Sequence, residues 1–447
     1  MKKIRLLIIA IAIVVSSSLF ARAIVKEGHF IHDANKQYLK MFYANPDLTI
    51  DLVSSDGYEV YGPDGLGQWL DQIKVNYTKL EQGNEKNIKS GYPSPEKINE
   101  ELQRIVNKYS HIMKIVKIGK SVNGRDLVFV KISDNPEIDE VEPEFKYIGN
   151  MHGDEITNRD VLVKFIEWLG ESYATNTQVG ELIDNTEIWI MPSMNPDGAA
   201  RRRRGNAKWI DLNRDFPDFT TNDNENTVQG RAIETQAVMN FQKERRFALS
   251  ANFHGGAVVV NYPWDTTSAR PPLHELITEI SSEYANLVDE MVNSSRFPGG
   301  IVNGYDWYTI NGGMQDWSFY WHGDLQTTIE MHGIKWPSYS AVEKFYEDHR
   351  ESLLKYIRRV HHGAGLKLSE PVSGNVKIFK IDAGLKKNEK EDIGRFSFNK
   401  GEFFKVLESG NYEFMISTKN RGNYHVELSV EPNSIFPNGN YKYIELK

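Results

Sequence analysis

His152, Glu155 and His254 are residues whose types and spacing could bind a metal ion. The segment His152-Gly-Asp-Glu155 separates a histidine and a glutamate by three positions, so both can face one ion from a tight turn or a first helical turn. His254 would complete a set of two histidines and one carboxylate, which leaves one tetrahedral position for water, as in a catalytic zinc site. By itself the His-x-x-Glu spacing is a weak signal, because the chain has 12 histidines and 61 acidic residues, and His152 could instead be a surface or capping histidine.

Both motifs follow predicted strands. Apolar runs predict strands at 145–150 and 247–253, so the motifs would lie at strand ends, where open α/β sheets bind their ligands. The pattern predicts further strands at 187–191 and 325–331, and helices at 160–169, 234–243, 276–292 and 341–360. This alternation predicts an α/β fold with a mixed central sheet flanked by helices over residues 91–365.

The start of this domain carries two local signals. Ser94-Pro95 is typical of a helix start, with serine as the cap and proline in the first position. Asn123-Gly124 separates two alternating stretches and predicts a hairpin turn.

The regions on either side of residues 91–365 differ from this domain in composition and in the pattern of apolar residues. Residues 24–90 are polar and contain turn residues, which favours an N-terminal accessory region or a pro-segment. After residue 366, short strand-like runs alternate with turns and predict a small all-β sandwich to the end of the chain; the runs are 375–381, 394–398, 403–407, 412–417 and 424–430.

Residues 1–23 have the features of a secretory signal peptide. Three basic residues precede an apolar run at 6–15, which is too short to span a bilayer, and Ala21-Arg22-Ala23 is a small-x-small cleavage pattern. The alternative is an uncleaved membrane anchor. We expect export to the periplasm or the extracellular space without a stable membrane anchor.

Composition excludes several kinds of site. The chain has no cysteine, so any metal must be held by His, Asp or Glu, and thiolate catalysis is ruled out. Its formal net charge is −8, and the expected signal peptide carries four of its basic residues. An acidic protein is a poor binder of nucleic acid and a plausible host for cationic substrates.

Six motifs in order resemble the zinc carboxypeptidase family, in its regulatory N/E-type branch. They are GNMHGDE (149–155), MPSMNPDG (191–198), RGNAKWIDLNRDFPD (204–218), LSANFHGGAVVVNYPWD (249–265), GIVNGYDWYTINGGMQDW (300–317) and TTIEM (327–331). The resemblance covers about residues 94–365. It implies one zinc ion per chain and hydrolysis of the C-terminal peptide bond. It also implies that the all-β tail is the transthyretin-like domain of this branch.

The resemblance assigns catalytic roles residue by residue. It makes His152, Glu155 and His254 the zinc ligands, Glu330 the general base, and Arg204 the residue that stabilises the oxyanion. Arg204 ends a run of four arginines, and a neighbouring arginine could take its place. We expect the other three, 201–203, to form a solvated basic loop or a nucleic-acid patch.

Five further residues match substrate-binding positions of the family. Asn213 and Arg214 would grip the terminal carboxylate of the substrate, and Tyr308 would close over it. Gln315 would lie at the base of the side-chain pocket, and Asp265 would receive a basic side chain. Asp265 could instead cap the turn that follows it, and Tyr308 could be a packed aromatic residue.

The sequence therefore predicts a secreted carboxypeptidase that prefers C-terminal Lys or Arg on peptides or proteins. We expect a monomer that binds no nucleic acid. Two alternatives stay open: an enzyme that trims diaminopimelate from peptidoglycan stem peptides, and a catalytically silent binding module that uses the β tail for adhesion.

Overall fold

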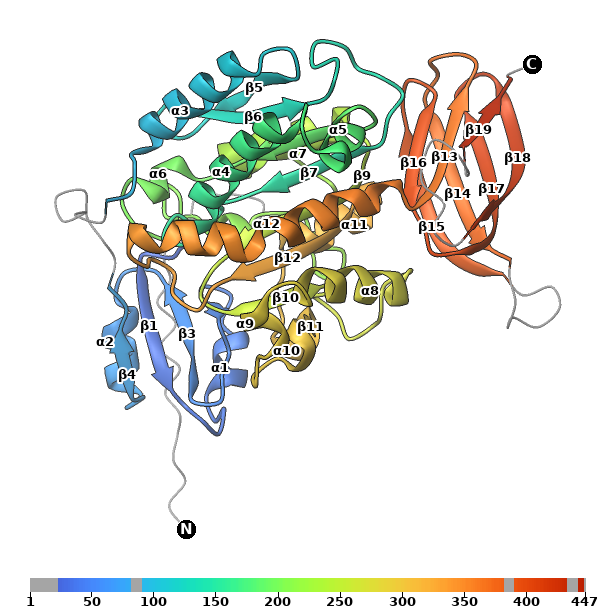
Figure 1. Ribbon diagram of the computed structural model, residues 1–447. Coiled ribbons are helices and arrows are strands. Elements are labelled where there is room, and N and C mark those ends of the chain that lie inside the picture. The colour runs from blue at the N-terminus through green and yellow to red at the C-terminus, as the bar shows by residue number, and fades with distance from the viewer. Residues whose placement is uncertain (1–22, 82–90, 382–389, 432–440, 446–447) are drawn as a thin grey trace.

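The computed structural model describes residues 23–81, 91–381, 390–431 and 441–445 (Figure 1). The signal peptide expected at residues 1–23 lies outside these ranges except for its last residue. A large α/β domain occupies the centre, with a small N-terminal unit on one side and a β domain at the other end. Within the described ranges, no helix is both long and apolar enough to cross a membrane.

The centre of the molecule is a mixed sheet of eight strands in the order β11-β10-β12-β9-β7-β8-β6-β5. The middle strands β12, β9, β7 and β8 run parallel to one another, whereas β10 and β6 are antiparallel to their inner neighbours. The strands are β5 (Met113–Lys120), β6 (Asp126–Ile132), β7 (Glu144–Ile148), β8 (Glu187–Met191), β9 (Phe247–His254), β10 (Val258–Tyr262), β11 (Ile301–Asn303) and β12 (Leu325–Met331). This confirms the predicted α/β fold.

Helices cover both faces of this sheet and create two apolar cores. The first face packs on α3 (Pro95–Lys108), α4 (Thr157–Ser172), α5 (Thr177–Ile183), α8 (His274–Ala285) and α12 (Val342–Arg358). The second face packs on α7 (Ile233–Glu244) and α11 (Met314–His322). Successive side chains of β6 point to opposite faces of the sheet. Val128 and Val130 therefore enter the first core, and Leu127 and Phe129 enter the second.

The parallel strands bring distant residues to one edge of the sheet. β7 leads into the loop that carries His152 and Glu155, and β9 ends at His254. β12 runs parallel to β9 with Glu330 beside His254 in the register. Parallel strands end at the same edge, so this topology assembles the site from three separate segments.

The N-terminal unit is a four-stranded antiparallel sheet in the order β2-β3-β1-β4. Its elements are β1 (Glu27–His32), α1 (Leu39–Tyr43), β2 (Thr49–Asp51), β3 (Gly57–Gly62), α2 (Leu66–Gln72) and β4 (Tyr77–Lys79). It has a small core of its own, in which Phe42 and Leu70 are fully buried beneath Tyr58 and Val60.

The C-terminal domain contains a three-stranded sheet, β16-β13-β19, and a four-stranded sheet, β15-β14-β17-β18. The strands are β13 (Gly363–Leu368), β14 (Gly374–Lys380), β15 (Glu391–Phe398), β16 (Glu402–Val406), β17 (Gly410–Thr418), β18 (Gly422–Val430) and β19 (Tyr441–Ile444). Its buried side chains belong to the same continuous core as the first face of the central sheet. Gly323 (φ +67°) ends α11 against the Phe396 ring, where an added Cβ would lie 2.3 Å from a ring carbon.

The sequence predicted most of these elements, and the structure corrects some of them. Ser94 caps α3, and Gly124 (φ +82°) forms the turn between β5 and β6, as predicted. The predicted helix at 276–292 is confirmed only as far as Ala285, because Val288 is extended and separates α8 from α9 (Asp289–Val292). β13 was not foreseen, and it crosses the proposed domain boundary at 365/366.

The remaining elements are short and lie in the connections between the larger elements. They are α6 (Pro196–Ala199), η1 (Leu212–Arg214), η2 (Pro298–Gly300), α10 (Gly304–Trp307), η3 (Tyr339–Ala341) and η4 (Arg359–His361).

Candidate active site

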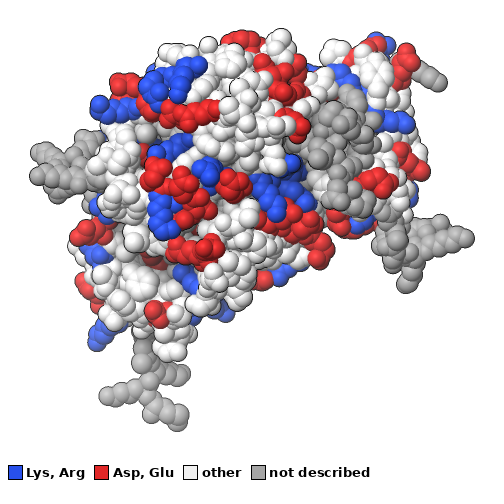
Figure 2. Space-filling model, viewed as in Figure 1, with Lys and Arg blue, Asp and Glu red and all other residues white. Residues whose placement is uncertain are grey.

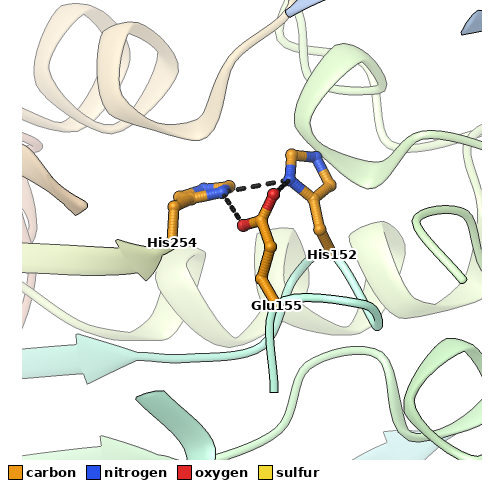
Figure 3. A group of neighbouring side chains, drawn as sticks. All are labelled: His152, Glu155 and His254. Atoms are coloured by element: carbon orange, nitrogen blue, oxygen red, sulfur yellow. Dashed lines mark hydrogen bonds and ion pairs between the residues drawn. The ribbon is translucent and has the colours of Figure 1, made fainter. Parts of the chain in front are cut away.

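His152, Glu155 and His254 converge on one point (Figure 3). Nδ1 of His152 lies 3.0 Å from Glu155 Oε1, Nδ1 of His254 lies 2.8 Å from Glu155 Oε2, and the two Nδ1 atoms are 3.0 Å apart. All three side chains are buried, with exposures of 2–3%. Two ring nitrogens aimed at the same carboxylate from within 3.0 Å of each other suit a shared cation, and two His with one Glu is a donor set of zinc.

A tight turn after β7 lets the first two members of this group meet. Asn150 adopts a left-handed backbone conformation (φ +54°), which asparagine tolerates better than most residues. Its side-chain amide donates to the backbone oxygens of His152 (2.9 Å) and Glu155 (3.3 Å). The turn is therefore held by its own first residue before α4 begins at Thr157.

Asp211 holds two site residues in place. Its Oδ1 lies 3.0 Å from Nε2 of His152, and its Oδ2 accepts from Nε of Arg204 at 2.7 Å. A carboxylate on the far nitrogen of a metal-binding histidine fixes the ring and its tautomer. Burial opposes the ionised form, but Arg204 and then His152 hold the pKa of Asp211 well below its usual range.

Glu330 lies next to this group on β12. It is 5% exposed, and its Oε2 has no hydrogen-bond partner among the described residues. Burial, followed by the nearby carboxylates of Glu155 and Asp51, raises the pKa of Glu330 well above its usual value. A buried carboxylate with a free oxygen at a metal site is suited to exchange a proton with water.

Arg204 approaches the same point from the loop after α6. Its guanidinium is 1% exposed and lies 3.7 Å from Glu155 Oε1. Nη1 donates to Asp51 of the N-terminal unit at 2.5 Å, whereas Nη2 has no hydrogen-bond partner in the described part of the chain. This cation is fixed in place with one donor left over.

Three residues that the sequence assigned to carboxylate binding contact either a proposed metal ligand or strand β2. Asn213 and Arg214 come from the short helix η1, and the Asn213 side chain lies 3.5 Å from Nε2 of His254. Arg214 donates through Nη2 to the backbone oxygen of Ile50 at 2.9 Å. The Tyr308 hydroxyl donates to Asp51 Oδ1 at 2.8 Å.

Asp265 and Gln315 are both buried and in contact with each other. Asp265 Oδ1 accepts from the amides of Asn261 (3.0 Å) and Gln315 (3.1 Å). Gly304 makes room for it, since a Cβ there would lie 1.7 Å from the same oxygen. Burial raises the pKa of Asp265 to about 7.

The comparisons with known proteins agree with this geometry. A family model described as zinc carboxypeptidase matches residues 98–352. Carboxypeptidase M of Mus musculus is 34% identical over 355 residues, which are 74% of this chain and 78% of that protein. The catalytic chain of carboxypeptidase N of Homo sapiens is 32% identical over 372 residues, which are 74% of this chain and 81% of that protein.

The chain belongs to the zinc carboxypeptidase family.

Two further comparisons define the extent of this likeness. Carboxypeptidase D of Homo sapiens is 34% identical over 343 residues, which are 71% of this chain and 24% of that protein, so the chain spans about a quarter of the length of that relative. In fold, it is similar to carboxypeptidase A of Helicoverpa armigera, with a TM-score of 0.58 at 18% identity over 76% of this chain and 97% of the other.

The candidate site contains residues that the sequence did not single out. Asp211 is part of a motif that resembles the family, so that motif could have pointed to it. Asp51 on β2 and Lys335 after β12 also enter the site, with Lys335 Nζ 3.1 Å from Asp51 Oδ2. No motif or spacing marks either residue, because only the packing of the N-terminal unit brings them together.

The arginine run is partly different from the prediction. We expected residues 201–203 to be solvated, but Arg203 is 3% exposed and its guanidinium lies 4.0 Å from the centre of the Trp209 ring. The prediction is wrong for this residue, because the loop folds back under the indole. Arg201 and Arg202 are partly exposed. On the face in Figure 2, acidic and basic side chains are interspersed and form no single large basic patch.

Proposed function

We propose that this carboxypeptidase is an exported zinc exopeptidase that removes C-terminal Lys or Arg from peptides. The observation that carries the basic preference is Asp265, a carboxylate that is 2% exposed and whose hydrogen-bond donors are neutral amides. A buried carboxylate is costly unless it is paired, so a substrate that brings a cation is favoured over one that does not.

His152, Glu155 and His254 hold the zinc ion in this proposal. When bound, zinc supplies Lewis acidity, which makes water a stronger nucleophile and a carbonyl carbon a stronger electrophile. Glu330 takes the proton from the attacking water on Oε2 and gives it to the amine nitrogen as the C–N bond breaks. The free Nη2 of Arg204 is the donor available to the negative charge that develops on the carbonyl oxygen.

The preference for a chain end comes from a second group of residues. The guanidinium of Arg214, the amide of Asn213 and the hydroxyl of Tyr308 can together bind a terminal carboxylate. An internal peptide bond has no charge at that position, so it would leave the arginine unpaired.

Three further parts of the proposal concern the whole protein. The pattern at residues 1–23 supports export, and the two small sheets after Gly363 support a transthyretin-like domain. The net charge of −8 supports peptide substrates over nucleic acid. We propose that the protein acts as a monomer.

The test is release of the terminal residue from matched peptides that end in Arg, Lys, Phe or diaminopimelate. We expect Arg and Lys to be released about 10²-fold faster than Phe, which corresponds to about 3 kcal/mol for a buried polar group that is left unpaired. A chelator should abolish release and zinc should restore it. Glu330→Gln should lower kcat by about 10² to 10⁴, the usual contribution of a general base.

Other outcomes would replace the proposal. Equal rates for Arg and Phe would remove the basic preference, and fastest release of diaminopimelate would favour a stem-peptide enzyme. If the Glu330→Gln variant equals the wild type, Glu330 is not the base.

A further inference from the structure

The first turn of α11 holds the loop that carries Asp265. Asp316, the third residue of this helix, is 4% exposed and accepts hydrogen bonds from two backbone N–H groups outside the helix. The backbone nitrogen of Asp265 lies 2.9 Å from its Oδ2 and 3.1 Å from its Oδ1, and the backbone nitrogen of Thr266 lies 3.0 Å from Oδ2. A carboxylate at this position often binds the start of its own helix, but this one fixes a neighbouring loop.

The same turn of α11 also fixes the side chain of Asp265. Gln315, the residue before Asp316, donates to Asp265 Oδ1 at 3.1 Å, and Asn261 on β10 donates to the same oxygen at 3.0 Å. Neither amide uses Oδ2, so this is the oxygen that stays available to a substrate. The start of α11 therefore determines both where the backbone of Asp265 lies and which of its oxygens is already bound.

A third buried carboxylate holds the loop from another side. Asp218, which is also 4% exposed, accepts from the Thr266 hydroxyl at 3.1 Å through Oδ1 and from the backbone N–H of Gly312 at 2.9 Å through Oδ2. Gly312 has a left-handed backbone conformation (φ +73°) in the turn that precedes α11. Asp218 and Asp316 thus both bind Thr266, the residue next to Asp265.

The three carboxylates place negative charge in a buried region without a contacting cation. Within the described ranges, no Lys, Arg or His forms an ion pair with Asp218, Asp265 or Asp316, and the donors to these residues are backbone N–H groups, hydroxyls and amides. Arg214 on η1 favours the ionised form of Asp265 from a greater distance, whereas Asp218 opposes it. Burial, followed by the charge of Asp265, raises the pKa of Asp316 well above its usual value.

We propose that Asp316 is a positioning residue of the proposed side-chain pocket, which fixes Asp265 in place and whose charge makes the pocket hold a basic side chain more tightly than Asp265 alone would. The inference rests on the proposed function, because it concerns the pocket assigned to Lys and Arg. A cation in this pocket lies near two carboxylates, so Asp316 adds to the attraction although Asp265 makes the contact. The same charge makes Asp265 harder to ionise while the pocket is empty.

These two effects of Asp316 predict a specific pH dependence. At low pH the empty pocket is protonated, so the extra attraction that Asp316 gives the cation is offset by the extra cost of ionising Asp265. At high pH Asp265 is already ionised in the empty pocket, so only the attraction remains. Neutralising Asp316 should therefore lower the selectivity at high pH and leave it nearly unchanged at low pH.

The first experiment measures the ratio of kcat/KM for peptides ending in Arg to that for Phe, from pH 5 to pH 8, in the zinc-loaded full chain. The variant is Asp316→Asn, whose single amide oxygen can still accept from both N–H groups, as Oδ2 does in the wild type. We expect its ratio to be about tenfold below wild type at pH 8 and equal at pH 5, with the plateau reached about one pH unit lower.

Thr266→Val is the matched control, because it disturbs the same loop without changing a charge. Its ratio should level off at the same pH as in the wild type. If Asp316→Asn changes the ratio by one constant factor at every pH, Asp316 acts only through the fold of the pocket, and the inference is overturned.

The second experiment does not depend on hydrolysis. Free L-arginine, which carries the guanidinium of the product, is titrated into the full chain by calorimetry at pH 5 and at pH 8. The wild type should bind it about tenfold more tightly than Asp316→Asn at pH 8 and equally at pH 5. Asp218→Asn removes the other neighbouring charge, should give a smaller effect with the same pH dependence, and serves if Asp316→Asn does not fold. Equal changes in affinity at both pH values would contradict the inference.

The two experiments separate this inference from the proposed function. Binding of L-arginine with the expected pH dependence, but without peptide hydrolysis in any variant, would support the role of Asp316 and remove the proposed reaction. Preferential release of Arg with the same pH profile in wild type and Asp316→Asn would support the reaction and remove the role of Asp316.

Discussion

Two buried carboxylates flank the proposed substrate site, Asp51 on the N-terminal unit and Asp265 in the proposed side-chain pocket, and their surroundings have opposite effects. Burial opposes ionisation of both Asp51 and Asp265. Near Asp51, the cations of Arg204 and Lys335 overcome burial and hold its pKa well below the usual range. Near Asp265, the amide donors and the more distant Arg214 do not, and its pKa rises to about 7.

The difference shows which of the two carboxylates lacks a cation as its partner within the chain. Asp51 already has its cations within its own chain, so it acts as a ligand of the site. Asp265 has amides as its hydrogen-bond partners, and Asp218 and Asp316 are acidic neighbours that oppose its ionisation further. Its missing cation must come from outside, which is the physical basis of the proposed preference for Lys and Arg.

The sharpest test of this comparison is Asp265→Asn. We expect kcat/KM for peptides ending in Arg to fall about 10²-fold or more, because the guanidinium would enter a buried pocket without a counter-charge. Release of a terminal Phe should change little. Steady-state kinetics on the two peptides measures both effects, and an equal loss on both would show that Asp265 supports the fold of the pocket and not its selectivity.

The pH dependence of selectivity should follow Asp265 and not Asp51. The ionised form of Asp265 binds the cation, so the ratio of kcat/KM for Arg to that for Phe should be full above pH 7. It should fall by up to about tenfold per unit below that, because the carboxyl becomes protonated as the pH drops through its pKa. The ratio cancels groups that act on both substrates. In Asp265→Asn the ratio should be flat between pH 5 and 8, whereas Asp51→Asn should keep the wild-type profile.

Lys405, a buried cation in the C-terminal domain, can be compared with the two carboxylates. We expect its substitution to have the smallest effect of the changes considered. Lys405 is 2% exposed, donates to the backbone oxygen of Gly323, and lies over the rings of Phe319 and Phe396. Burial lowers the pKa of Lys405 to about 7, although Asp324 opposes this. Its charged form is therefore costly in the folded state, as for Asp265.

Lys405→Met should raise stability by about 1 kcal/mol at pH 6, where the wild-type lysine is charged in both the folded and the unfolded state. The advantage should shrink and then reverse as the pH rises from 7 towards 10.5, because the folded protein then holds the lysine neutral while the unfolded chain still binds the proton, which favours the wild type by about 1.4 kcal/mol per pH unit. Melting temperatures at pH 6 and pH 10 test this, and activity should not change. A variant that is less stable at both values would show that the hydrogen bond to Gly323 outweighs the cost of burial.

Local signals in the sequence predicted much of the fold. The serine cap of α3, the turn at Gly124 and the apolar runs of β8 and β12 depend on residues that are close in the chain, so they could be read without tertiary information. The break between α8 and α9 was missed, because the apolar spacing continues across Val288 and only packing decides its extended conformation.

Part of the candidate site could also be predicted, because some of its residues lie in local motifs that can be recognised in the sequence. The metal-binding group and Glu330 lie in segments with recognisable motifs at strand ends. Asp51 lies on a short strand with no motif, and its partner Lys335 is nearly 300 positions away. Sequence spacing carries no information about a contact of that kind.

The sequence by itself determined the donor types, the absence of cysteine and the order of the motifs, and these already point to zinc and to hydrolysis at a chain end. Only the tertiary structure decided which carboxylates are paired. The parallel register of β12 and β9 places Glu330 beside His254, and the packing of β2 against the cleft gives Asp51 the cations that Asp265 lacks. Charge pairing acts over a few ångströms in space, so it is fixed by the fold and not by distance along the chain.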